Sequence, residues 1–170
     1  MKIKISNKWI GDNSPVFVTA EVGINHNGSL KLAKKLVKSA KDSGADAIKF
    51  QTFKASDIAT QKSKFYKIFK KVELDESDYG EISDYAKSNS IIFFSTPVNE
   101  SAVDILLKLK VPAFKIGSGN LTNIPVIKYA ASKRKPMIVS TGMSNIDEIN
   151  LAINSIKKQT YQNIEIIIHD

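Results

Sequence analysis

The chain of 170 residues contains no cysteine, and this absence excludes disulfide bonds, cysteine-ligated zinc and a cysteine nucleophile. It also lacks any apolar run near the roughly 20 residues that a membrane-spanning helix requires. The first five residues alternate polar and apolar side chains, without the long apolar core of a signal peptide. We therefore expect a cytoplasmic protein with no membrane partner.

Arginine is nearly absent, because Arg134 is the only one, whereas lysines spread along the sequence raise the net charge to +8. Arginine is the residue that most often recognises guanine edges and binds phosphate with two hydrogen bonds. The charge therefore favours solvated helix surfaces over a nucleic-acid interface. We expect no nucleic-acid partner.

Short apolar runs alternate with amphipathic segments along the chain. Runs rich in valine, isoleucine, phenylalanine and alanine predict strands at residues 17–23, 47–53, 91–97, 113–119, 136–142 and 164–170. Amphipathic patterns predict helices at residues 29–43, 78–89, 100–110 and 124–132, and a last one with a capping box at Ser144 and Asp147. Strands that alternate with helices predict an α/β fold with a parallel sheet covered by helices.

Two segments interrupt this alternation. Residues 1–15 are expected to form an N-terminal hairpin, with strands at residues 2–5 and 8–10, and residues 16–170 to form a single domain. The connection over residues 54–77 is unusually long and is predicted to contain a short helix near residues 62–71. Such a connection can be a lid over a site or a packing insertion, and the sequence leaves both open.

Polar residues share one face of the predicted strands. Because side chains alternate between the two faces of a strand, one face is apolar and the other carries Glu21, Lys49, Gln51, Lys115 and Ser140. A charge inside an apolar strand is costly unless it is paired or bound to a ligand. We interpret these residues as an active-site cluster at the strand ends; a structural network of ion pairs is the alternative.

Two lysines that converge at strand ends would bind a phosphate or carboxylate, together with the backbone N–H groups of the turns at residues 117–119 and 140–142. Glu21 is the expected proton-transferring residue. Dinucleotide- and triphosphate-binding glycine motifs are absent from the sequence. His26 could be a hydrogen-bonding residue of its turn or part of the site, and His169 could face a substrate.

Several segments closely resemble motifs of the sialic acid synthases, a family that includes N-acetylneuraminate, legionaminate and pseudaminate synthases. They are EVGINHNG at 21–28, GADAIKFQTFK at 44–54, FSTP at 94–97, FKIGSG at 114–119 and STGM at 140–143. The resemblance implies a TIM (β/α)8-type barrel, present here through about the sixth strand.

The resemblance also implies the reaction. Phosphoenolpyruvate would condense with a 2-acetamido hexose such as N-acetylmannosamine, with a divalent metal (Mn²⁺ or Mg²⁺) as cofactor. C3 of the enol would attack the sugar aldehyde, water would add at C2, and phosphate would leave by C–O cleavage. The metal would polarise the aldehyde as a Lewis acid.

The matching positions imply roles for individual residues. Glu21 would handle the proton of the attacking water, and Gln51 would help to orient phosphoenolpyruvate. The residues that would hold its phosphate and carboxylate are Lys49, Lys115, Ser118 and Ser140, with Thr96 nearby. We add His169, at the end of the last predicted strand, as a candidate substrate-binding residue.

The sequence departs from the family at three places. Asn120 stands where an acidic residue is usual, and Asp170 follows His169 in place of a Cys-Thr-Ser-like run. The last two βα units, with the metal-binding histidines, and the antifreeze-like C-terminal domain are not in this sequence, so no metal ligand is assigned. We expect an incomplete barrel that either forms a homo-oligomer or closes up as a shortened sheet resembling a doubly wound open fold. A non-catalytic fragment that retains a phosphoenolpyruvate or phosphate site is the alternative function, and a flavodoxin-like phosphate-binding module is a third.

Overall fold

The computed structural model describes residues 2–158, which fall into two compact units. One unit is formed by residues 17–111 and the other by residues 2–16 together with residues 112–158. The predicted strand at residues 164–170, and His169 with it, lies outside the described residues. The predicted division into residues 1–15 and 16–170 stays a prediction.

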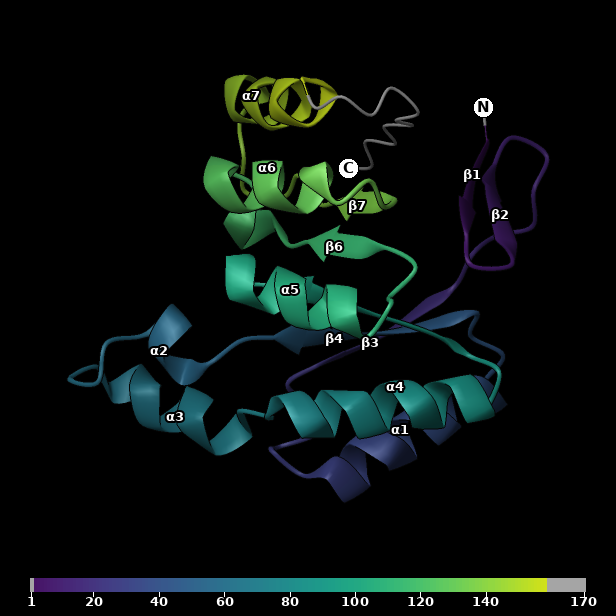
Figure 1. Ribbon diagram of the computed structural model, residues 1–170, viewed down its shortest axis with the longest axis vertical. Helices are drawn as coiled ribbons and strands as arrows, with labels where there is room; N and C mark the ends of the chain where they lie inside the picture. Colours follow the sequence, from purple (N-terminus) through teal and green to yellow (C-terminus); the bar gives the residue numbers. More distant parts are fainter. Residues whose placement is uncertain (1, 159–170) are drawn as a thin grey trace. The chain divides into compact units, whose positions relative to one another are not determined.

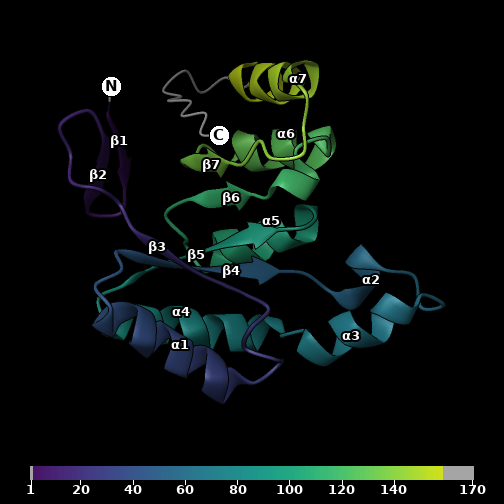
Figure 2. The same ribbon diagram turned by 180° about the vertical axis from the view of Figure 1, so that it is seen from behind.

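The unit of residues 17–111 is built on three parallel strands. They pair in chain order (Figure 1; β5 is labelled in Figure 2): β3 (Thr19–Gly23), β4 (Ala47–Thr52) and β5 (Ile92–Pro97). The longer helices are α1 (Leu30–Asp42), α4 (Glu76–Ser88) and α5 (Glu100–Lys108). Helices α1 and α4 pack against each other and against the strands, as both views show (Figure 2). The predicted α/β arrangement is confirmed here.

The register of these strands separates an apolar face from a polar one. Ile48 pairs with Phe93, and the ring of Phe50 packs on that of Phe93 with their centroids 5.7 Å apart. On the other face Glu21 stands opposite Lys49, and Gln51 opposite the threonine of the FSTP motif. Residues opposite in register share a face, so the predicted placement of Glu21 and Lys49 on one face is confirmed, although Phe94, opposite Lys49, also lies on that face.

The long connection after β4 contains two short helices, α2 (Ala55–Ile58) and α3 (Lys64–Val72). The ring of Phe69 meets that of Phe53 edge-on, with centroids 5.8 Å apart. Gly28, at φ +73°, lies so close to the end of α3 that a Cβ on it would be 2.2 Å from the carbonyl oxygen of Lys71. These contacts anchor α3 and support the packing interpretation of this connection.

The second unit contains a hairpin and two parallel strands. The hairpin consists of β1 (Lys2–Ile5) and β2 (Lys8–Gly11), with Ser6 at φ +56° in the turn, as predicted. The parallel pair is β6 (Phe114–Ile116) and β7 (Met137–Val139). The helices are η1 (Ser118–Asn120, a 3₁₀ turn), α6 (Ile124–Ser132) and α7 (Ile146–Lys157), of which α6 and α7 pack together.

Three local predictions need correction. The predicted strand at residues 113–119 ends at Ile116, because Ser118–Asn120 turns into a 3₁₀ helix. The predicted strand at residues 136–142 is limited to Met137–Val139. The capping box of α7 is one residue later than predicted: the Asn145 side chain accepts from the Glu148 N–H, and the Glu148 carboxylate accepts from the Asn145 N–H, each at 2.9 Å. None of these changes moves the site residues away from the ends of their strands.

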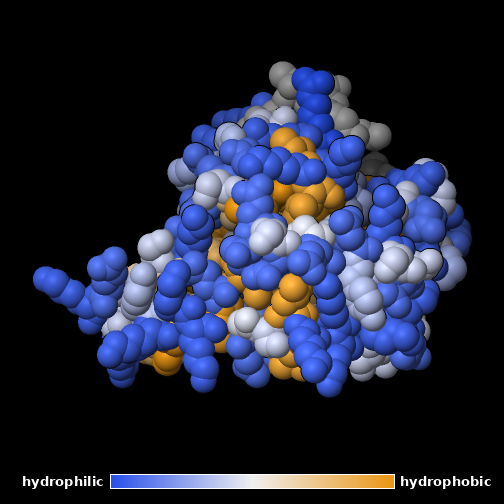
Figure 3. Space-filling view, turned by 60° about the horizontal axis from the view of Figure 1, so that its bottom comes forward, coloured by the Kyte–Doolittle hydropathy of each residue, from blue (hydrophilic) through white to orange (hydrophobic). Residues whose placement is uncertain are grey.

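The outer surface of the helices carries much of the positive charge. On α1, Lys31, Lys35 and Lys38 are exposed. Figure 3 shows mainly hydrophilic residues on this side, with smaller hydrophobic areas between them. Among residues 2–158, no helix is both long enough and apolar enough to cross a membrane.

Candidate active site

A buried ion pair connects the first two strands of the site. Lys49 Nζ lies 2.8 Å from Glu21 Oε2; the lysine side chain is only 8% exposed, whereas that of Glu21 is 57% exposed. A buried ammonium without a partner would be strongly unfavourable, and the Glu21 carboxylate supplies that partner. The pair is open to solvent on its Glu21 side.

Gln51 and Thr96 stand opposite each other two residues further along the strands. Gly23, at φ +55°, ends β3 beside them: a Cβ there would be 3.6 Å from both Gln51 Nε2 and Glu21 Oε1. The Thr96 side chain is buried, and its hydroxyl has no hydrogen-bond partner among residues 2–158. Buried hydroxyl groups without a partner are rare, so the Thr96 hydroxyl, opposite Gln51, is a candidate hydrogen-bonding group for a ligand.

A second polar cluster lies at the ends of β6 and β7. Lys115 Nζ donates to Ser140 Oγ and, at 2.8 Å, to the Ile116 carbonyl oxygen. The Ser140 N–H donates to the same carbonyl at 3.0 Å, which fixes the turn after β7. A Cβ on Gly142 would lie 3.7 Å from Ser118 Cβ, so the turns that carry Ser118 and Ser140 are neighbours.

The structure thus groups the predicted site residues within each unit. Glu21, Lys49, Gln51 and Thr96 form one cluster, and Lys115, Ser118 and Ser140 form the other.

His26 lies on the helix-facing side of β4. It is fully buried, its Nδ1 accepts the Gly28 N–H at 3.2 Å, and its ring stacks on Phe50 with centroids 5.9 Å apart. Burial lowers the pKa of His26, although the Asp78 carboxylate acts in the opposite direction. The interpretation of His26 as a hydrogen-bonding residue of its turn is confirmed.

Sequence reasoning missed two groups that support this region. Tyr79, on the first turn of α4, donates its hydroxyl to the Gln51 carbonyl at 2.7 Å. Thr52 and Ser95 form a buried hydroxyl pair at 2.8 Å on the face opposite Gln51. Both contacts join segments distant in the sequence, so no local motif could have indicated them.

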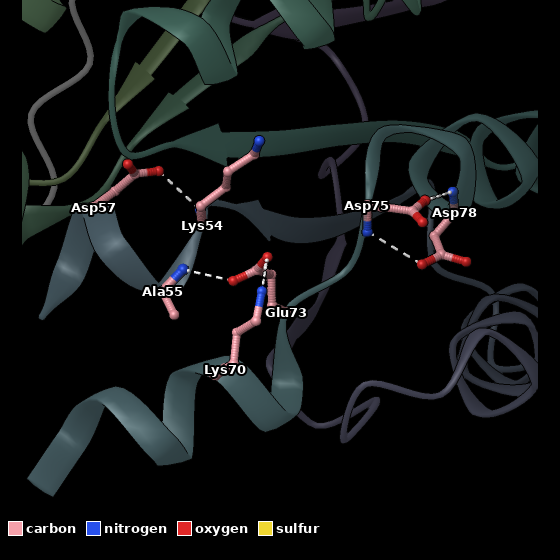
Figure 4. A network of polar contacts seen from close by, with 7 residues as sticks. All are labelled: Lys54, Ala55, Asp57, Lys70, Glu73, Asp75 and Asp78. Carbon is pink, nitrogen blue, oxygen red and sulfur yellow. Dashed lines mark hydrogen bonds and ion pairs between the residues drawn. The ribbon is translucent and has the colours of Figure 1, made fainter. Parts of the chain in front are cut away.

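Glu73 ties the connection after β4 together. Figure 4 shows its carboxylate accepting from the Ala55 N–H and pairing with Lys70, each at 2.8 Å, and so joining α2 to the end of α3. Partial burial acts to raise the pKa of Glu73, but these two partners outweigh it, so the pKa lies below its usual value. The segment that directly follows Gln51 is therefore held in place by charge-assisted hydrogen bonds.

Among residues 2–158, no three histidine, aspartate or glutamate side chains are grouped so that they could hold a metal ion. Glu21 is a single carboxylate already paired with Lys49. The described residues therefore do not form a site for the divalent metal that the resemblance implies.

Parallel strands that alternate with helices, with polar side chains gathered at the strand ends, are typical of the barrel-type α/β fold. Residues 36–169 match the NeuB family, and the chain belongs to it. The fold is of the TIM-barrel type, as the resemblance implied.

Individual relatives agree with this assignment. The chain is 46% identical to an uncharacterised protein of Methanocaldococcus jannaschii over 168 residues, which cover 99% of this chain and 50% of that protein. It is 43% identical to the N,N'-diacetyllegionaminic acid synthase of Legionella pneumophila over 161 residues, or 86% of this chain and 45% of that enzyme.

The crystal structure of an N-acetylneuraminic acid synthetase from Leptospira borgpetersenii, in complex with citrate, matches with a TM-score of 0.91 and 30% identity. That match covers 95% of this chain and 57% of the other. The chain thus spans about half the length of the curated relatives it matches.

Proposed function

We propose that the chain belongs to a transferase-type synthase that condenses phosphoenolpyruvate with an N-acetylated hexose resembling N-acetylmannosamine. The product is a sialic-acid-type nonulosonate, and phosphate is released. The observation that carries the proposal is the buried Lys49 ammonium paired with the exposed Glu21 carboxylate, in the same unit as the opposed Gln51 and Thr96, whose buried hydroxyl has no partner among residues 2–158. Membership of the NeuB family supports the same reaction.

In this proposal the two lysines bind the two anionic groups of phosphoenolpyruvate. Lys49 is buried, so its attraction for an anion is screened less than it would be in water. Lys115 is already aimed by Ser140 and by the Ile116 carbonyl, and Ser118 lies beside that turn. Preorganised donors of this kind can hold the enol so that its C3 faces the sugar aldehyde.

Glu21 accepts the proton of the attacking water. In the ligand-free protein its carboxylate is the partner of Lys49 at 2.8 Å. An anion that binds Lys49 competes for the ammonium and leaves Glu21 available as a base. Water then adds at C2, and phosphate leaves by cleavage of the C–O bond. No step is assigned to a metal, because residues 2–158 supply no ligand set for one.

The wider assignments follow from this reaction. The partners are the two small-molecule substrates, and a cytoplasmic location suits an enzyme that uses phosphoenolpyruvate. The homo-oligomer expected from the sequence remains a prediction.

A second candidate is a non-catalytic chain that only binds phosphoenolpyruvate or phosphate. The observation that favours it is the contrast between the anion-binding residues, which are present, and the metal ligands, which residues 2–158 do not provide. It predicts binding without turnover.

One assay separates the two candidates. Purified chain is mixed with phosphoenolpyruvate, N-acetylmannosamine and Mn²⁺, and phosphate release is measured beside calorimetric titration with phosphoenolpyruvate alone. Release above background supports the synthase, and binding without release supports the binding protein. Lys49→Met should lose binding, whereas Lys35→Met, which removes an exposed lysine of α1, should retain it. If the unaltered chain does not bind phosphoenolpyruvate, both candidates are wrong.

A further inference from the structure

Tyr79 reaches from α4 to the strand that carries Gln51. It lies in the first turn of the helix, after the cap residue Asp75, and is only 2% exposed. Its hydroxyl donates to the backbone carbonyl oxygen of Gln51 at 2.7 Å. A buried phenol needs a polar partner, and this one has found a main-chain carbonyl at the candidate site.

The Gln51 carbonyl needs the Tyr79 hydroxyl as a partner because the pairing of β4 with its neighbour β3 ends before Gln51. The pairing of β3 with β4 shifts register between Glu21 and Gly23, and its last pair is Gly23 with Phe50. Gln51 therefore has no partner in β3. A buried carbonyl left without a hydrogen bond costs about 1–3 kcal/mol, and the phenol supplies that bond in place of a strand.

The next residue is held from the other side. Thr52 shares a buried hydroxyl contact of 2.8 Å with Ser95, and its carbonyl accepts the Val98 N–H at 3.2 Å. Together with Tyr79, these contacts fix the backbone at the end of β4. Burial raises the pKa of Tyr79 above its usual value, so the phenol keeps its proton at neutral pH and remains a donor.

We propose that Tyr79 is a positioning residue: by holding the Gln51 carbonyl it directs the Gln51 amide into the space beside Gly23, between Glu21 and Thr96. The amide nitrogen lies 3.6 Å from the position that a Gly23 Cβ would occupy. The inference rests on the proposed function, in which Gln51 orients phosphoenolpyruvate. Tyr79 itself touches no substrate.

A double-mutant cycle tests this coupling. Tyr79→Phe keeps the ring and removes only the hydroxyl, so the protein should fold, and affinity for phosphoenolpyruvate should fall about tenfold. Gln51→Ala should lower the affinity by at least as much. The double variant should bind no more weakly than Gln51→Ala alone. If Tyr79→Phe lowers the affinity equally in both backgrounds, or lowers it in neither, Tyr79 does not act through Gln51 and the proposal is wrong.

A second measurement does not depend on the ligand. The side-chain amide resonances of Gln51 in the free protein should shift and broaden in Tyr79→Phe. They should stay unchanged in Tyr85→Phe, a matched control on the same helix whose ring contacts Lys34. Unchanged Gln51 resonances in Tyr79→Phe would overturn the positioning role. An unaltered chain that binds no phosphoenolpyruvate would overturn the proposed function, while these resonances still decide the role of Tyr79.

Discussion

Buried hydroxyl groups on the two faces of β4 and β5 differ in whether they have a hydrogen-bond partner. Thr52 and Ser95 satisfy each other on the helix-facing side, whereas Thr96, on the site face, has no partner among the described residues. Replacing a hydroxyl group that is hydrogen-bonded within the fold should therefore affect stability more than replacing one that has no partner. Substitution by valine, which has nearly the same shape, removes only the polar group.

We predict that Thr52→Val lowers the free energy of unfolding by about 1–2 kcal/mol, because it leaves the Ser95 hydroxyl buried alone. Thr96→Val should leave stability unchanged or slightly higher and should weaken phosphoenolpyruvate binding. Urea denaturation and calorimetric titration measure the two effects. A large loss of stability in Thr96→Val would mean that its hydroxyl already has a partner in the folded protein.

His26, the buried histidine among residues 2–158, predicts a pH dependence. Burial lowers the pKa of His26, so the folded chain keeps the imidazole neutral where the unfolded chain already takes up a proton. Stability is therefore full above the unfolded value of about 6.5 and declines as the pH falls below it. Urea denaturation between about pH 7.5 and about pH 5.5 should show this decline, and His26→Gln should flatten it. Equal slopes for the two proteins would contradict the assignment, since His169 is common to both.

At the scale of helices and strands, the sequence correctly predicted the features that follow from the periodicity of apolar and polar residues. Alternation with a period of two placed Lys49 and Glu21 on one face, and the register confirms it. The predicted length of β6 was wrong, because the run used for the prediction extends into residues that form the 3₁₀ turn η1. Ser144 and Asn145 are both good cap residues, so the helix start was off by one. The Tyr79 contact spans 28 residues, and no local pattern encodes it.

The contact between the first turn and α3 depends on a glycine. We predict that Gly28→Ala lowers the free energy of unfolding by at least about 2 kcal/mol, from left-handed strain plus a clash with the Lys71 carbonyl. Gly44→Ala is the matched control: its φ is +84°, but nothing lies within 4 Å of the added Cβ, so strain alone should cost about 1 kcal/mol. Thermal and urea denaturation of both variants measure the difference. Equal losses would mean that α3 moves aside and does not pack firmly on the turn.

At the scale of the whole molecule, the two lysines of the proposed reaction belong to different compact units. Lys49 belongs to the unit of residues 17–111, and Lys115 to the other. Each lysine is held by partners within its own unit, Glu21 in one case and Ser140 in the other. Each cluster therefore depends on contacts inside its own unit.

The proposed reaction consumes one phosphoenolpyruvate per product, so we predict a stoichiometry of one phosphoenolpyruvate per chain. Because the proposed function assigns both lysines to this substrate, Lys49→Met and Lys115→Met should each weaken binding by about 100-fold or more, with no residual site. Lys31→Met, which removes an exposed charge on α1, should bind normally. Calorimetric titration gives both the number of sites and their affinity. Two bound anions per chain, of which each lysine variant keeps one, would show that the lysines serve separate sites, and the condensation mechanism would then lose its substrate geometry.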